Sequence, residues 1–106
     1  IPDLASVTYT GLGANTYIIT NNGSQTIVLY TLCVVVVSLA TTLAISPGGT
    51  GSFANFLIGI PPTAGFYAFL NFAPGGLQFA TGDALTIGGP NAGAATVYTS
   101  ATYKYA

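Results

Sequence analysis

Side chains that are charged at neutral pH are almost absent from this sequence. Its 106 residues include one lysine and two aspartates, Lys104, Asp3 and Asp83, and no Glu, Arg, His, Met or Trp. General acid–base catalysis needs a titratable group such as His or a pair of carboxylates, and metal sites need clusters of Cys, His or carboxylates. One lysine cannot neutralise a track of phosphates. We therefore expect no enzyme activity, no cofactor or metal and no nucleic-acid partner.

Cysteine is equally scarce, because Cys33 is the only one. A single cysteine excludes an intrachain disulfide, and its place inside an apolar run indicates a small core residue rather than a reactive thiol. A chain of 106 residues is long enough to build one hydrophobic core without such a crosslink. We expect a single domain.

The low charge also constrains the surface. Charged residues are 3% of this chain, against about 25% in an ordinary soluble domain, and the mean hydropathy is +0.67. The surface must consist mostly of Thr, Ser, Asn, Gly, Ala and Tyr. Large exposed apolar patches mark interaction sites, so we expect other subunits to cover much of it.

The segment TIVLYTLCVVVVSLATTLAI, Thr26 to Ile45, contains no charged residue. Its length would allow a membrane-spanning helix, but the basic flanks that orient such a helix are missing, since the only basic residue is the distant Lys104. The run is rich in Val, Ile and Thr, which favour strands. It predicts two strands joined near Leu39, and no membrane span; a spanning or interfacial helix is the disfavoured alternative.

Turn signals recur about every 8 to 12 residues along the rest of the chain, without a helical period. This pattern predicts an all-β, single-domain antiparallel β-sandwich or jelly roll of about eight strands. Residues 1–15 form an N-terminal arm or first strand, and residues 16–106 form the sandwich. The side chains that we expect in its core are Val34, Val36, Phe66, Leu70, Phe79, Leu85 and Ile87.

Two segments give more local expectations. The turn Asn21-Asn22-Gly23-Ser24 suits a β-hairpin, because Asn-Gly readily adopts positive φ angles; the strands on both sides should pair. The segment Phe66 to Phe72 is apolar on both of its alternating faces, which predicts a strand that is covered on both sides.

Candidate contact residues lie at the two ends of the chain. The arm Ile1 to Thr10 is the segment least tied to the predicted sandwich, and aromatic side chains are enriched at interfaces. The candidates for intersubunit contact are Ile1, Leu4, Val7, Tyr9, Tyr98, Tyr103 and Tyr105. Asn22 begins an Asn-Gly-Ser triplet in an exposed turn and is a candidate glycosylation site.

The order of segments from about residue 16 to residue 106 resembles the small β-sandwich virion proteins of tailed bacteriophages. The likeness lies in a glycine-led apolar strand running into a glycine turn, a short apolar strand, a small-residue loop and a last strand with Val and Tyr. The matching residues are Gly76, Leu77, Phe79, Gly82, Leu85, Ile87, Val97 and Tyr103. The resemblance implies a head decoration (cement) protein or another capsid or tail accessory subunit, and it transfers no functional residues. Those proteins usually carry more charge.

The expected function is therefore that of a non-enzymatic structural subunit of a virion, which binds copies of itself and a major capsid or other virion protein through apolar and main-chain contacts. The alternative is an extracellular or cell-surface filament subunit, pilus-like or thread-like, in which the N-terminal arm completes the sheet of the next subunit. A carbohydrate-binding module is a third reading, and it requires an exposed aromatic platform.

Overall fold

The computed structural model describes residues 2–10, 16–48, 57–88 and 95–106. Within these residues it contains nine strands and no helix. The strands are β1 (Asp3–Tyr9), β2 (Thr16–Ile19), β3 (Ile27–Ser38), β4 (Leu43–Pro47), β5 (Ile58–Ile60), β6 (Tyr67–Asn71), β7 (Leu77–Gln78), β8 (Leu85–Gly88) and β9 (Thr96–Tyr105).

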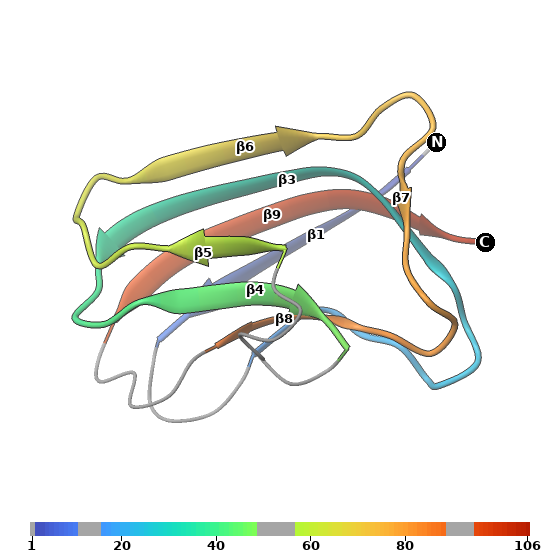
Figure 1. Ribbon diagram of the computed structural model, residues 1–106, viewed down its shortest axis with the longest axis horizontal. Helices are drawn as coiled ribbons and strands as arrows, with labels where there is room; N and C mark the ends of the chain where they lie inside the picture. Colours follow the sequence, from blue (N-terminus) through green and yellow to red (C-terminus); the bar gives the residue numbers. More distant parts are fainter. Residues whose placement is uncertain (1, 11–15, 49–56, 89–94) are drawn as a thin grey trace.

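The strands form two antiparallel sheets that pack face to face (Figure 1). Sheet A has the order β1-β9-β3-β6, and the short β7 also pairs with β3. Sheet B has the order β2-β8-β4-β5. The prediction of an all-β, antiparallel sandwich is confirmed.

The pairing of the strands is nested. The first strand pairs with the last, β2 with β8, β3 with β6 and β4 with β5. The chain therefore folds back on itself as one long hairpin, which is rolled up so that β9 also joins β3 and β8 also joins β4. This arrangement is the jelly roll.

The uncharged run at residues 26–45 forms two strands, as predicted. The first, β3, spans 12 residues and the second, β4, spans five. They are not neighbours in one sheet, because β3 lies at the centre of sheet A and β4 lies in sheet B. The chain changes sheets between Ser38 and Leu43, so the apolar inner faces of both strands meet across the core.

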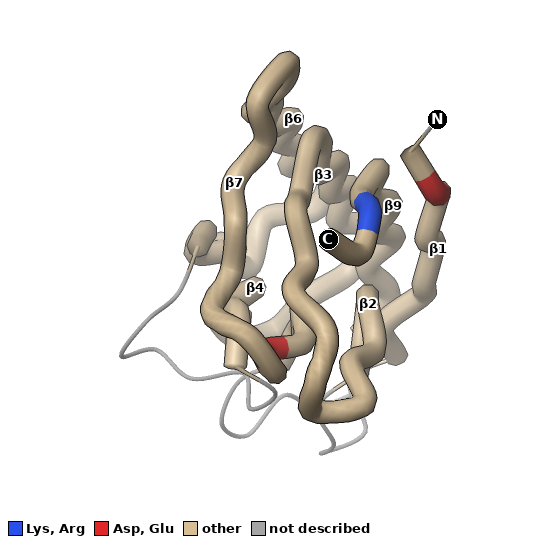
Figure 2. Tube along the Cα trace, turned by 90° about the vertical axis from the view of Figure 1, so that its right-hand side faces the viewer, with Lys and Arg blue, Asp and Glu red and all other residues tan. Residues whose placement is uncertain are grey.

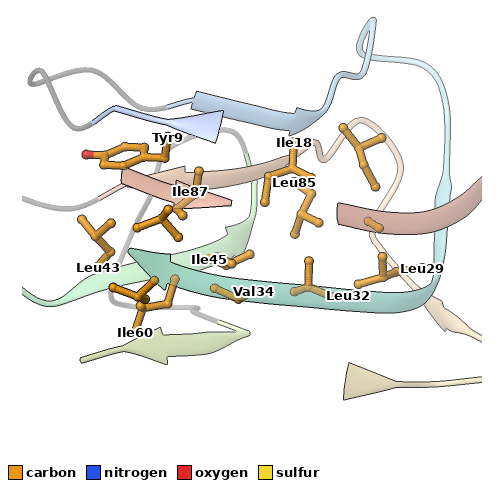
Figure 3. Close-up of a cluster of buried hydrophobic side chains, with 14 of the residues drawn as sticks. Tyr9, Ile18, Leu29, Leu32, Val34, Leu43, Ile45, Ile60, Leu85 and Ile87 are labelled. Carbon is orange, nitrogen blue, oxygen red and sulfur yellow. The ribbon is translucent and has the colours of Figure 1, made fainter. Parts of the chain in front are cut away.

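The core lies between the sheets and is almost wholly aliphatic (Figure 3). Five of the seven predicted core residues are buried: Val34, Val36, Phe79, Leu85 and Ile87. The other two, Phe66 and Leu70, are partly buried and pack against this cluster from β6 and the turn before it. An edge strand has no neighbour on one side, and its side chains are accordingly less enclosed.

The hairpin predicted at residues 21–24 is wrong, because β2 and β3 lie in different sheets. Gly23 does have a positive φ of 98°, but the side chain of Asn21 redirects the chain. Its amide nitrogen donates hydrogen bonds to the carbonyl oxygens of Gln25 at 2.8 Å and Asp83 at 2.9 Å. Its Oδ1 atom accepts the N–H of Gly23 at 2.9 Å. The turn is thus attached to the loop before β8 and forms a corner between the sheets.

Candidate interaction surface

The outer face of sheet A carries the most unusual surface of the described residues. Directly paired residues of neighbouring strands share a face, so the strand register gives its composition. Across β1, β9, β3 and β6, the aromatic row is Thr8, Tyr98, Val35 and Tyr67; the serine row is Ser6, Ser100, Cys33 and Phe69; and the threonine row is Leu4, Thr102, Thr31 and Asn71. None of these twelve side chains is charged.

Several large apolar side chains on this face are open to solvent. Tyr67 is 74% exposed and Phe69 is 58% exposed, both on β6. Leu4, Val35, Val37 and Tyr98 are exposed as well. The prediction that residues 66–72 are covered on both sides is therefore wrong within one chain, because sheet B covers only the inner side of β6. Among the described residues, nothing encloses Tyr67 and Phe69 on its outer side.

A shallow hollow of about 310 Å³ lies beside these side chains. Small residues on three neighbouring strands, Ser6, Ser100 and Cys33, form part of its lining, and Tyr98 and Val35 flank them. The prediction that Cys33 is a core residue is therefore wrong, because its side chain is on the outer face and is partly exposed. The relief follows from the sequence, since serines stand opposite each other in β1 and β9 while β6 carries Phe69 in the same row. The outer face thus has a depression over β9 and a ridge, Tyr67 and Phe69, over β6.

Hydrogen bonds hold the strands under this surface together. The hydroxyl groups of Thr31 and Thr102 are 2.6 Å apart and join β3 to β9. The buried Thr99 hydroxyl donates to the carbonyl oxygen of Val7 at 3.1 Å and joins β9 to β1. The ridge and the hollow therefore sit on a sheet whose strands are linked by side chains as well as by the backbone ladder.

The predicted contact residues of the N-terminal arm fall on both faces of β1. Leu4 lies on the outer face and is exposed, whereas Val7 points inward and is partly buried against the core. Tyr9 is only 1% exposed, and burial raises the pKa of its phenol above the ordinary value of 10.0. Ile1 lies outside the described residues. Along its full length β1 pairs with β9, so the arm is an edge strand of this chain.

The three predicted contact tyrosines of β9 likewise lie in different environments. Tyr98 lies on the outer face of sheet A, but Tyr103 and Tyr105 pack at the end of the core, with their ring centroids 5.4 Å apart in an edge-to-face arrangement. The Tyr105 hydroxyl donates to the carbonyl oxygen of Thr20 at 2.7 Å, just after β2. Burial, then the neighbouring Tyr105 and the charge of Asp3, raise the pKa of Tyr103. These two rings close one end of the sandwich.

Sequence reasoning missed four residues of this surface: Val35, Val37, Tyr67 and Phe69. The signal was present, since the segment from Phe66 to Phe72 is apolar on both faces. Which neighbours stand beside β6 depends on long-range pairing, and no local pattern reveals it. Asn22, the candidate glycosylation site, is exposed, and its Oδ1 accepts hydrogen bonds from the backbone and the hydroxyl of Ser24.

Two of the three charged residues lie on neighbouring strands, and the third lies apart from them (Figure 2). Asp3 is on β1 and Lys104 on β9 in sheet A, whereas Asp83 precedes β8 of sheet B. Among the described residues, no three His, Cys, Asp or Glu side chains gather where they could hold a metal ion. The same part of the chain has no helix of the length and apolarity that a membrane crossing needs.

No protein-family model and no curated protein matches this chain.

Proposed function

We propose that this chain is a non-enzymatic structural subunit of a virion, of the capsid decoration, cement or accessory type. Its role is to stabilise a protein shell through apolar and main-chain contacts with copies of itself and with a major capsid or other virion protein. The observation that carries the proposal is the outer face of sheet A, whose three central rows are uncharged and on which Tyr67 and Phe69 stand exposed.

The size of this surface supports an assembly role. The chain has an accessible area of 5313 Å², close to the ~5500 Å² that scaling gives for a compact monomer of 10.7 kDa. Loose folding therefore does not explain the exposed apolar side chains. With ~200 Å² for a fully exposed large side chain, the six on the outer face of sheet A offer on the order of 600 Å², at the upper end of the largest patches on ordinary monomers.

Composition and fold point in the same direction. With three charged residues, the chain has little to keep it dispersed as a free monomer at high concentration. Jelly rolls occur in viral capsid proteins, and also in lectins and cupins; this is an analogy at the level of the fold. With no His or Glu in the sequence, the chain offers few side chains for acid–base catalysis, which supports the structural proposal.

Electron microscopy of the native source material, with gold-labelled antibody against this chain, tests the proposal. We expect label at regular positions on phage heads or tails, together with a fixed stoichiometry of this chain to the major capsid protein by mass spectrometry. Label confined to cellular material without particles would overturn the virion assignment.

An extracellular filament subunit is the second candidate, and the position of β1 favours it. As an edge strand, β1 pairs only with β9 and yet places Tyr9 in the core. An edge strand at a chain terminus is the kind of element that a neighbouring subunit can supply by β-augmentation. In that arrangement, the β1 seen here beside its own β9 would belong to the next subunit.

A disulfide across β1 and β9 separates the two candidates. Leu4 and Thr102 stand directly opposite each other, so we suggest a Leu4→Cys/Thr102→Cys variant in a Cys33→Ser background, oxidised in its assembled state. A virion subunit that keeps its own β1 gives a monomer band on a non-reducing gel. A filament with exchanged β1 strands gives a ladder of covalent multimers.

A further inference from the structure

The outer face of sheet A carries a ridge and a hollow side by side. In the serine row, Phe69 on β6 and Ser100 on β9 stand on either side of Cys33 on β3. Neighbouring strands are ~4.8 Å apart, so the ridge and the centre of the hollow are each about one strand spacing from β3. A rotation by 180° about a line along β3 therefore places the ridge of one face over the hollow of an identical face.

We propose that the outer face of sheet A packs on the same face of a second copy about such a two-fold axis, with the Phe69 ridge of each chain seated in the other's hollow. This proposal rests on the proposed structural function and names the partner that covers the face. The axis keeps each row at its own level along the strands. Tyr67 then meets the partner's Tyr98, and Asn71 meets the partner's Thr102.

Self-complementarity is the reason for choosing a second copy over another protein. A two-fold interface needs both halves of each contact on one surface, and here a protruding aromatic side chain and a cavity of about 310 Å³ lie on the same face. Two identical charged faces would repel each other, but none of the twelve residues in the three rows is ionised. The one charged side chain that alternation places on this face, Lys104, lies on β9 one row beyond Thr102. The axis sets it opposite the partner's β6–β7 side, and not opposite the partner's β9.

Packing geometry and area fit the same arrangement. Sheets that pack face to face lie ~10 Å apart with their strands within about 30° of parallel, which an axis along β3 produces. The exposed apolar side chains on this face offer on the order of 600 Å², and a stable interface of standard size takes ~800 Å² from each partner. Small polar residues around the apolar centre, such as Ser6 and Thr8, supply the remainder.

Cys33 gives a test that needs no substitution. It lies beneath the proposed axis, so the thiols of two partners face each other across the interface. A bifunctional maleimide that reaches ~10 Å, the spacing of packed sheets, should link native chains into a covalent dimer at micromolar concentration. A dimer that forms in the absence of any covalent link, but is not trapped by this reagent, would contradict the axis.

Exchanging the two contacting residues tests the seating of the ridge. Analytical ultracentrifugation of the full chain should show that Phe69→Ser weakens the dimer on the order of 10³-fold, because an anchor is worth about 2 kcal/mol or more and each dimer loses it twice. Ser100→Phe fills the hollow and should weaken it similarly. The double variant Phe69→Ser/Ser100→Phe restores the complementarity and should recover at least tenfold.

The matched control is Tyr17→Ser, which removes a half-exposed aromatic side chain from β2 of sheet B and should change the dimer affinity less than twofold. Circular dichroism checks that each variant folds. A double variant that dimerises no better than its single parents would overturn the two-fold arrangement while leaving a structural role intact. A native chain that is monomeric in solution, and is also absent from virions and filaments, would overturn both.

Discussion

The two sheets have similar inner faces and opposite outer faces. Both inner faces are lined by Val, Leu and Ile that are almost fully buried. On the central strands of sheet B the outward side chains are small or polar, Ala44, Ser46 and Thr86, and all three are 0% exposed. On sheet A the outward side chains include large aromatic rings that are mostly exposed.

The two outer faces differ in when their side chains would leave water: on folding in the centre of sheet B, and on assembly in sheet A. The outward residues of the two central strands of sheet B, β8 and β4, are already buried within the folded chain. The Thr86 hydroxyl donates to the carbonyl oxygen of Ser46 at 3.3 Å. The large apolar side chains on the outer face of sheet A gain less from folding, because they stay largely in water. The proposed partner would remove these large apolar side chains from water.

Truncating an inward-facing side chain should lower the free energy of unfolding by a similar amount in either sheet. This is the largest effect that we expect. Leu32→Ala in sheet A and Ile45→Ala in sheet B each remove a fully buried side chain and should lower the free energy of unfolding by about 2–5 kcal/mol. Urea denaturation at a concentration where the chain is monomeric measures this. A cost below ~1 kcal/mol in one sheet would show that the two inner faces are not parts of one core.

Substitutions of outward-facing residues should change the stability of the chain by different amounts in the two sheets. Ala44→Leu in sheet B inserts a larger side chain into a filled space and should cost about 1–3 kcal/mol. Ser6→Leu in sheet A adds the side chain to an exposed position and should change the stability of the monomer by less than about 0.5 kcal/mol. The same denaturation experiment compares them, and equal costs would remove the distinction between the outer faces.

A substitution at the corner where the chain passes from sheet B to sheet A should have an intermediate effect on the free energy of unfolding. Asn21→Ala removes the side chain that bonds the turn to the carbonyl oxygens of Gln25 and Asp83, leaving partly buried groups without those partners. We expect a loss of about 1–2 kcal/mol. Asn22→Ala, at an exposed position one residue away, is the control and should cost less. A neutral Asn21→Ala would show that the corner does not depend on this side chain.

The smallest expected effect on stability is that of alkaline pH, and it comes from Tyr9 on the inner face of sheet A. The pKa of Tyr9 is raised in the folded state by burial, so the folded chain holds its phenol proton more tightly than the unfolded chain. The contribution of Tyr9 is fully present below pH 10 and is lost as the pH rises through the folded-state pKa. The denaturation midpoint should fall above pH 10, and Tyr9→Phe should reduce this fall. An unchanged fall in that variant would mean that Tyr9 is not its source.

Local patterns in the sequence were sufficient for the strands and for much of the core. The β-branched run predicted two strands, and alternation placed Val34, Val36, Leu85 and Ile87 inside. The nested pairing was beyond local patterns, because the partner of β1 is β9, more than 80 residues away. The hairpin prediction failed for the same reason, since the hydrogen bond between Asn21 and Asp83 links distant segments.

The surface was harder to predict than the core. Tyrosine content singled out Tyr98, which is on the outer face of sheet A, but also Tyr103 and Tyr105, which pack at the end of the core. An aromatic residue in a strand is equally compatible with either face until the register is known. The doubly apolar segment around Tyr67 was the more informative signal, because the described residues cover only the inner side of β6.

Hydroxyl-radical footprinting of the native assembly tests the central claim most directly, with the dissociated chain as its reference. We predict that Tyr67, Phe69 and Tyr98 become protected on assembly, while Tyr17, which is 50% exposed on sheet B, keeps more of its reactivity. Equal oxidation of Tyr67 and Phe69 in the assembled and dissociated states would show that the outer face of sheet A stays in water, and would contradict the account.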